Sequence, residues 1–254
     1  MPESNFFDAI VVGSGISGGW AAKELCEKGL KTLVLERGRN VEHVKDYPTA
    51  NMNPWDFKHP GKLSKEMKEN QHIQVRGFCN EANSHFFVND KEHPYNQVKP
   101  FDWIRGYHVG GRSLMWGRQC YRWSDLDFEA NAKEGIGADW PIRYRDIAPW
   151  YSYVEKFAGI SGSKEGLSHL PDGEFLPPME MNCLEKHISG ELKSKLSDRK
   201  MIIGRVANLT RGFTNRGPCQ FRNMCDRGCP FGGYFSSNSA TLPAARATGN
   251  LTLR

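Results

Sequence analysis

The sequence predicts an α/β fold that opens on a complete β-turn-α-β unit, and three neighbouring segments predict it. Residues 7–12 (FDAIVV) are a short apolar run whose length and composition indicate a buried strand. Residues 13–19 (GSGISGG) form a glycine-rich turn, and apolar residues at helical spacing follow as far as Gly29, a favourable helix end. Residues 31–36 (KTLVLE) then indicate a second strand.

The turn has the spacing Gly13-x-Gly15-x-x-Gly18, and an acidic residue, Glu36, closes the second strand. The first glycine permits a tight turn, the second lets the backbone approach a pyrophosphate, and the third lets the helix pack closely. A carboxylate at the end of the second strand can accept hydrogen bonds from ribose hydroxyls. This order predicts a Rossmann-like dinucleotide-binding unit, although glycine-rich turns also occur in other α/β proteins. The glycines alone do not distinguish FAD from NAD.

The overall composition is that of a globular protein. The chain has 254 residues, of which 25% are charged and 39% hydrophobic, and it carries a net charge of +5. No apolar run approaches the ~20 residues that a membrane-spanning helix needs. The first eight residues lack a secretory signal, which predicts a cytoplasmic protein. Nine Lys or Arg and a single acid, Asp226, follow residue 198, but without a stacking or groove-binding module they do not favour nucleic-acid binding.

Regular structure is expected in only parts of the remaining chain. We expect an irregular insertion over 45–99 with one short helix near 62–70, further helices over 145–158, 184–197 and 239–248, and short strands over 206–209 and 250–254. Because the last of these strands has just begun where the sequence stops, we expect the chain to be the N-terminal part of a longer protein.

Four stretches resemble the glucose-methanol-choline (GMC) family of FAD-dependent oxidoreductases: VVGSGISGG (11–19), VLERG (34–38), HVGGRSLMWG (108–117) and SATLPAARATGNLTLR (239–254). Within the family, the sequence looks closest to bacterial sugar and polyol dehydrogenases such as the large subunits of gluconate 2-dehydrogenase, FAD glucose dehydrogenase and glucoside 3-dehydrogenase. The resemblance implies a Rossmann-like FAD-binding domain of the GMC/p-hydroxybenzoate hydroxylase type. It also implies an irregular insertion, part of a substrate and electron-transfer domain, and a missing C-terminal half.

The resemblance also implies domain bounds. The FAD-binding domain is discontinuous and would comprise residues 1–44, 100–130 and 236–254. The insertion would comprise 45–99, and a partial substrate domain 131–235 with a cysteine-containing loop at 217–235.

The implied FAD-binding residues lie in both glycine-rich stretches: Gly13, Gly15, Ile16, Ser17, Gly18, Glu36, Arg37, Gly110, Gly111, Ser113, Trp116 and Gly117. Met115 stands where pyranose oxidases have a histidine bonded to FAD, so we expect a non-covalent flavin. The catalytic histidine of the family lies in a C-terminal region that nothing here matches, and we expect no catalytic residue in this chain. His108, near the second stretch, is expected to orient its loop.

Three of the seven cysteines, Cys219, Cys225 and Cys229, lie in one glycine-rich loop. Three converging thiolates suit an iron–sulfur cluster, and their spacing resembles that of FAD glucose dehydrogenases with a three-iron four-sulfur cluster. A zinc site and a loop without metal are the alternatives. Nearby arginines (Arg211, Arg216, Arg222 and Arg227) fit an anionic cluster, a docking surface for an acidic electron acceptor, or simply a soluble loop.

The expected function is an FAD-dependent dehydrogenase that oxidises CH–OH groups of a sugar or polyol. Electrons would leave the flavin through the cluster to a cytochrome c or a quinone, and a small subunit bearing a signal could carry the protein to the periplasm. Two alternatives are a GMC-type oxidase that uses O₂ without a cluster, and a catalytically incomplete FAD-binding fragment.

Overall fold

The computed structural model describes residues 6–196, 198–213 and 215–254. Its described residues form two compact units. Unit 1 comprises residues 6–116, 221–232 and 236–254, and unit 2 comprises the described residues among 117–220 together with 233–235. The domain bounds predicted from the sequence differ from these units in placing 117–130 with the FAD-binding domain and 221–232 with the partial substrate domain, and they stay a prediction.

Unit 1 is built on a small parallel sheet. Strands β1 (Ala9–Val12), β2 (Thr32–Leu35) and β3 (Leu251–Leu253) lie in the order β1-β2-β3, and both pairings are parallel. Helix α1 (Ile16–Glu27) connects β1 to β2. Strand β3 thus comes from the far end of the chain and pairs with β2, beside the β1-α1-β2 segment. This arrangement confirms the predicted Rossmann-like α/β fold.

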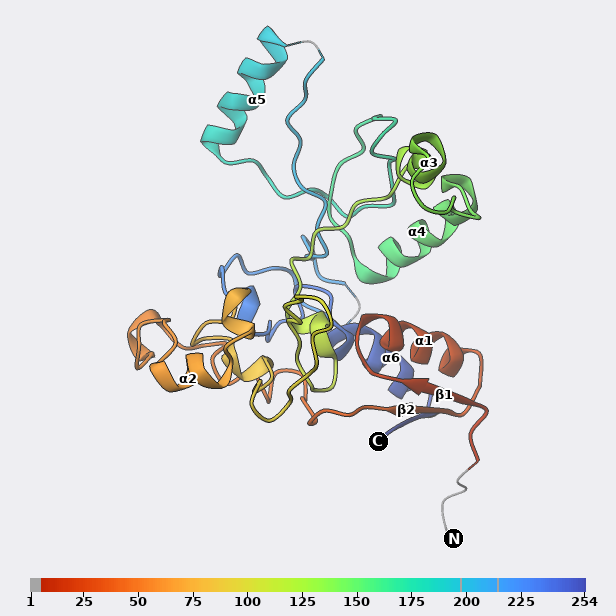
Figure 1. Ribbon diagram of the computed structural model, residues 1–254. Coiled ribbons are helices and arrows are strands. Elements are labelled where there is room, and N and C mark those ends of the chain that lie inside the picture. The colour runs from red at the N-terminus through yellow and green to blue at the C-terminus, as the bar shows by residue number, and fades with distance from the viewer. Residues whose placement is uncertain (1–5, 197, 214) are drawn as a thin grey trace. The chain divides into compact units, whose positions relative to one another are not determined.

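Helices α1 and α6 (Leu242–Ala247) lie side by side on one face of the sheet (Figure 1). The buried core between them consists of small and β-branched side chains: Val11, Ala22, Cys26, Val34 and Ala245. Successive strand residues point to opposite faces. Accordingly, Ile10 and Val12 lie on the other face of β1, where they are 63% and 85% exposed.

The insertion after β2 is irregular, as predicted. It holds one short α-helix, α2 (Lys65–Asn70), which begins after Ser64, and Ser64 Oγ accepts a hydrogen bond from Met67 N–H at 3.1 Å. It also holds three single 3-10 turns, at Pro54–Asp56, Gln74–Arg76 and Ser84–Phe86. A second hydrophobic cluster, separate from the one beneath the sheet, joins the insertion to the chain on either side of it. This cluster comprises Val41, Tyr47, Ala50, Cys79, Phe86, Phe87, Leu114 and Met115. This cluster anchors the insertion beneath the second glycine-rich stretch.

Unit 2 contains helices α3 (Asp125–Glu134), α4 (Tyr144–Ala158) and α5 (Cys183–Lys195). The sequence predicted α4 and α5 within two residues, but it missed α3. The capping box formed by Ser124 and Asp127 was the available signal for α3.

The short strand predicted at 206–209 is absent from the described structure. Val206 forms isolated bridges with Gln119 and Ser161, and Asn208 forms one with Tyr234. Because each bridge joins a different segment, no continuous ladder develops.

None of the helices in the part of the chain that the structure describes has the length and apolar composition needed to cross a membrane.

Candidate functional site

The glycine-rich turn between β1 and α1 shows a different structural reason for each glycine. Gly13 has φ +89°, a left-handed conformation that favours glycine. A Cβ on Gly18 would lie 1.9 Å from the backbone oxygen of Gly13, so only glycine fits there. A Cβ on Gly15 would meet no protein atom within 4 Å, and its φ of −63° suits any residue. Backbone conformation therefore explains Gly13 and close packing explains Gly18, but neither explains Gly15.

The N-terminus of α1 is suited to an anion. Gly15 is its N-cap residue and provides no side-chain hydrogen bond, and no acidic residue lies in the first turn, which contains Ile16 and Ser17. The first amides of a helix lack intrahelical partners and carry a partial positive charge. A phosphate group beside Gly15 would accept hydrogen bonds from these amides. No capping side chain would compete with it, and no carboxylate in the first turn would repel it.

Glu36 organises the end of β2. Its Oε2 accepts hydrogen bonds from Ser14 N–H at 3.0 Å and from the Ser14 hydroxyl at 2.5 Å, and its Oε1 accepts one from Gly38 N–H at 2.9 Å. Ser14 is fully buried. The carboxylate thus ties the glycine-rich turn to the chain that follows β2. An ionised carboxylate has about four acceptor positions, so a ribose hydroxyl can still be accommodated.

A cavity of about 410 Å³ opens beside Glu36, at the carboxyl end of the strands. Its lining comprises Glu36, Gly38, Asn40, Val109, Arg246, Leu253 and Arg254. In open α/β sheets, ligands bind outside the carboxyl ends of the strands. Arg246 and Arg254 line it together with the carboxylate of Glu36, so the lining offers both cationic groups for a phosphate and an acceptor for a hydroxyl.

The second glycine-rich stretch packs directly on the first. Gly110 N–H donates to the hydroxyl of Ser14 at 3.0 Å, and a Cβ on Gly111 would lie 3.5 Å from the Cα of Gly15. Gly110 has φ +87°, and the 3-10 turn Gly111–Leu114 follows it. Ser113 Oγ donates to the Gly110 carbonyl at 2.6 Å and so closes the loop. Two glycine-rich segments about a hundred residues apart therefore form one surface.

Most of the predicted FAD-binding residues meet here, namely Gly13, Gly15, Ile16, Ser17, Gly18, Glu36, Gly110, Gly111 and Ser113. The guanidinium carbon of Arg37 lies 3.8 Å from the ring centre of Tyr107, a cation–π contact. Trp116 is the last residue of this section of unit 1, whereas Gly117 belongs to unit 2. The sequence analysis missed Ser14 and Ser237, which hydrogen-bond the two stretches to each other. It also missed Asn238, which hydrogen-bonds the second stretch at Val109 to Val41, in the chain that follows β2.

His108 is buried beneath the second stretch. Its Nδ1 donates to the Val109 carbonyl at 3.0 Å, and residue 108 forms a parallel bridge with Arg39. Burial lowers the pKa of His108, and the charge of Arg39 acts in the same direction. The neighbouring His85 is also affected, since burial lowers its pKa to about 4. Both imidazoles are therefore neutral at pH 7.

The three loop cysteines are divided between the units. Cys219 belongs to unit 2, and Cys225 and Cys229 belong to unit 1. Among the residues that the structure describes, no group of three or more His, Cys, Asp or Glu side chains is arranged to hold a metal ion. The metal site at Cys219, Cys225 and Cys229 therefore remains a prediction.

The loop that contains Cys225 and Cys229 is attached to the insertion by charged side chains. Asp226 accepts hydrogen bonds from the side-chain amides of Asn80 and Asn83 at 3.1 and 3.2 Å. Arg222 donates to the carbonyl of Ala50 and to Asn51 Oδ1, and Arg227 donates to the Met52 carbonyl at 2.9 Å. These two arginines thus have a structural role that the sequence analysis did not foresee.

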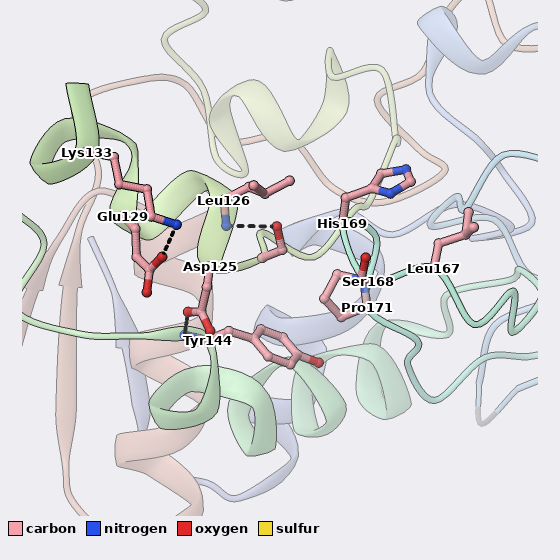
Figure 2. A pocket seen from close by; sticks show the side chains of 10 residues that line it. Asp125, Leu126, Glu129, Lys133, Tyr144, Leu167, Ser168, His169 and Pro171 are labelled. Atoms are coloured by element: carbon pink, nitrogen blue, oxygen red, sulfur yellow. Dashed lines mark hydrogen bonds and ion pairs between the residues drawn. The ribbon is translucent and has the colours of Figure 1, made fainter. Parts of the chain in front are cut away.

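Unit 2 has a cavity of its own, of about 450 Å³, between α3, the start of α4 and the loop 167–171 (Figure 2). Asp125 Oδ1 accepts a hydrogen bond from Tyr144 N–H at 2.8 Å, and Lys133 forms an ion pair with Glu129 at 2.5 Å. His169 stands on the opposite side of the cavity in Figure 2. Both acidic side chains of the lining, Asp125 and Glu129, already hold partners from the same unit.

Comparisons with known proteins identify relatives of this chain. Residues 11–82 match a family model described as an NAD(P)-binding Rossmann-like domain. The chain is 24% identical to the fructose dehydrogenase large subunit of Gluconobacter japonicus, with 94% of this chain and 43% of that protein aligned. It is 25% identical to the gluconate 2-dehydrogenase flavoprotein of Pantoea cypripedii, with 97% and 43% aligned. It is 23% identical to the paromamine 6'-oxidase of Streptomyces fradiae, with 99% and 40% aligned.

These relatives confirm the predicted resemblance to GMC-like oxidoreductases, including the bacterial sugar dehydrogenases. The chain spans about two fifths of the length of the relatives it matches.

Proposed function

We propose that this chain forms the FAD-binding part of an oxidoreductase that acts on CH–OH groups of a sugar or polyol. Gly15 is the observation that carries the proposal. It is a glycine that neither backbone conformation nor protein packing requires, at the uncapped N-terminus of α1. Its place in the motif is where the backbone must approach a pyrophosphate closely. The flavoprotein relatives favour FAD over a nicotinamide.

The residues present fit the cofactor. The amides of Gly15, Ile16 and Ser17 would hold the pyrophosphate, and Glu36 would accept hydrogen bonds from a ribose. The second stretch, with Gly110, Gly111 and Ser113, would continue towards the isoalloxazine together with Trp116 and Gly117. Arg37 would stay stacked on Tyr107 at the edge of the site. We assign no proton-transfer step to any side chain of this chain.

FAD, when bound, accepts a hydride from the alcohol carbon of the substrate. The chain's own contribution is to hold the cofactor without a covalent bond. Met115, whose side chain lies in the hydrophobic cluster of the insertion, offers no nucleophile for such a bond. Flavin that precipitated with the protein after acid denaturation would contradict this part of the proposal.

We further propose that Cys219, Cys225 and Cys229 bind a three-iron four-sulfur cluster that passes electrons to a cytochrome c or quinone, with a small subunit as partner. The spacing of the cysteines and the proline after Cys229 support this proposal. Iron and acid-labile sulfide assays on anaerobically purified protein test it. About three irons per chain are expected, whereas stoichiometric zinc or an absence of metal would contradict it.

An O₂-using oxidase is a second candidate, favoured by the likeness to an aminoglycoside oxidase. Reoxidation distinguishes the two candidates. The FAD-loaded chain is photoreduced without oxygen and then mixed with air-saturated buffer. A dehydrogenase is expected to reoxidise slowly and an oxidase rapidly, with stoichiometric H₂O₂.

The proposed cofactor function itself is tested by titrating the purified chain with FAD and, in parallel, with NAD⁺. Saturable quenching of flavin fluorescence at one FAD per chain is expected, with much weaker binding of NAD⁺. Preference for NAD⁺ would contradict the proposal.

A further inference from the structure

The helical turn that precedes α6 is unusual in both shape and polarity. Residues Ser237–Thr241 form a π-type turn, and all five are buried although four of them are polar. Single π-type turns occur often at functional sites. Buried polar side chains need hydrogen-bond partners, and two of these side chains find partners in the glycine-rich stretches and the chain beside them.

Ser237 joins the two glycine-rich stretches. Its hydroxyl donates to the Gly15 carbonyl at 3.0 Å, and its backbone N–H donates to Ser113 Oγ at 3.0 Å. Ser113 in turn donates to the Gly110 carbonyl. One residue is thus bonded to the N-cap of α1 and to the loop that lies over it.

Asn238 joins the second stretch to the chain that follows β2. Its side-chain amide donates to the carbonyls of Val41 and Val109 at 2.8 and 3.1 Å. Its Oδ1 lies against the Cα of Gly110, where a Cβ would be only 1.6 Å away. The glycine at position 110 therefore makes room for Asn238 as well as adopting a left-handed conformation.

On the α1 side, Gly19 makes room for the same polar turn. A Cβ there would lie 2.5 Å from Thr241 Oγ1 and 2.8 Å from Ser237 Oγ. The polar turn thus approaches α1 directly behind the proposed phosphate-binding amides. Ser237 therefore holds the two stretches against each other, and Asn238 holds the second stretch against the chain that follows β2.

We propose that Ser237 and Asn238 are positioning residues that set the affinity for FAD. Ser237 fixes the spacing of the two glycine-rich stretches, and Asn238 fixes the second stretch against the chain that follows β2. This inference rests on the proposed cofactor function. It predicts that removing either side chain weakens FAD binding although neither is assigned to touch the cofactor. A lost buried hydrogen bond of this kind is expected to weaken binding about tenfold.

The test uses the complete 254-residue chain and two variants, Ser237→Ala and Asn238→Ala. Thr248→Ala is the matched control, because Thr248 also makes two local hydrogen bonds at α6 but contacts neither glycine-rich stretch. FAD affinity is measured by fluorescence quenching. The melting temperature is measured with and without FAD.

We expect about tenfold weaker FAD binding and a smaller FAD-induced rise in melting temperature in both variants, and neither change in the control. A purely structural role would lower the melting temperatures with and without FAD equally and leave the affinity unchanged, which would overturn the inference. Asn238→Ala keeps the test decisive should Ser237→Ala fold poorly. Wild-type chain that bound no FAD would overturn the proposed function together with this inference, whereas unchanged affinity in the variants would overturn the inference alone.

Discussion

Gly15 and Gly18 belong to one motif, but the structure predicts opposite consequences for their replacement by alanine. In Gly18→Ala the new Cβ would lie 1.9 Å from the Gly13 oxygen and 2.9 Å from its carbonyl carbon, and both are backbone atoms. The turn or the helix must move, and overpacking of this kind costs about 1–3 kcal/mol or more. At about 2–4 °C per kcal/mol for a chain of this size, that lowers the melting temperature by roughly 2–12 °C.

In Gly15→Ala the new Cβ meets no protein atom within 4 Å, and φ is already compatible with alanine. The only intrinsic cost is that of alanine at a helix N-cap, about 1 kcal/mol at most. The methyl group would instead occupy the path of the pyrophosphate, so FAD binding should weaken at least about tenfold, or about 1.4 kcal/mol. Stability and ligand affinity are thus expected to separate between the two variants.

Thermal unfolding followed by circular dichroism, together with FAD titration, measures both effects. Gly190→Ala is the control, since Gly190 is an exposed residue inside α5 with open space around its Cα. Alanine there should raise stability by up to about 1 kcal/mol and leave FAD binding unchanged. The reasoning would be refuted if Gly15→Ala unfolded as readily as Gly18→Ala, or if it bound FAD with wild-type affinity.

Three further predictions concern other parts of the chain. The low pKa of His85, about 4 against 6.5 in the unfolded chain, means that the unfolded state gains its proton first as pH falls. Its contribution to stability is therefore complete above about pH 6.5 and is lost between about pH 6.5 and 4, to a total of about 3 kcal/mol. Urea denaturation across this range should show a shallower pH dependence in His85→Gln, and an identical slope would contradict the assignment. In unit 2, Glu155→Gln should destabilise the chain by about 3–5 kcal/mol, because it leaves the buried Arg122 guanidinium without its bidentate partner. A loss below about 1 kcal/mol, measured by chemical denaturation, would argue against a structural role for the pair. Glu36→Ala should lower both stability and FAD affinity, since Ser14 and Gly38 lose their shared acceptor. Unchanged affinity in that variant would remove Glu36 from the proposed site.

The local parts of the fold could be predicted from the sequence because their signals are local. The strands around Gly13 and Gly18 follow from a short apolar run and a glycine spacing, and α4 follows from its 3.6-residue periodicity. Helix α3 was missed although its capping box is visible at Ser124. Local sequence signals are therefore sufficient to locate these strands and helices.

The parts that could not be predicted depend on contacts between distant segments. Ser237 reaches Gly15 across 222 positions and Asn238 reaches Val109 across 129. Neither residue belongs to a recognisable local pattern. In the same way, Val206 bridges to Gln119 and Ser161 separately, which turns a strand-like segment into isolated bridges. Tertiary pairing decided these cases, and a single sequence does not contain that information in local form.

Equilibrium titration of the purified chain with FAD tests the central claim most directly, with flavin fluorescence as the signal and Gly15→Ala and Gly190→Ala measured alongside. The account predicts one FAD per chain, release of intact FAD on denaturation, and loss of affinity in Gly15→Ala alone. Binding that was absent, or that was equal in all three proteins, would contradict it.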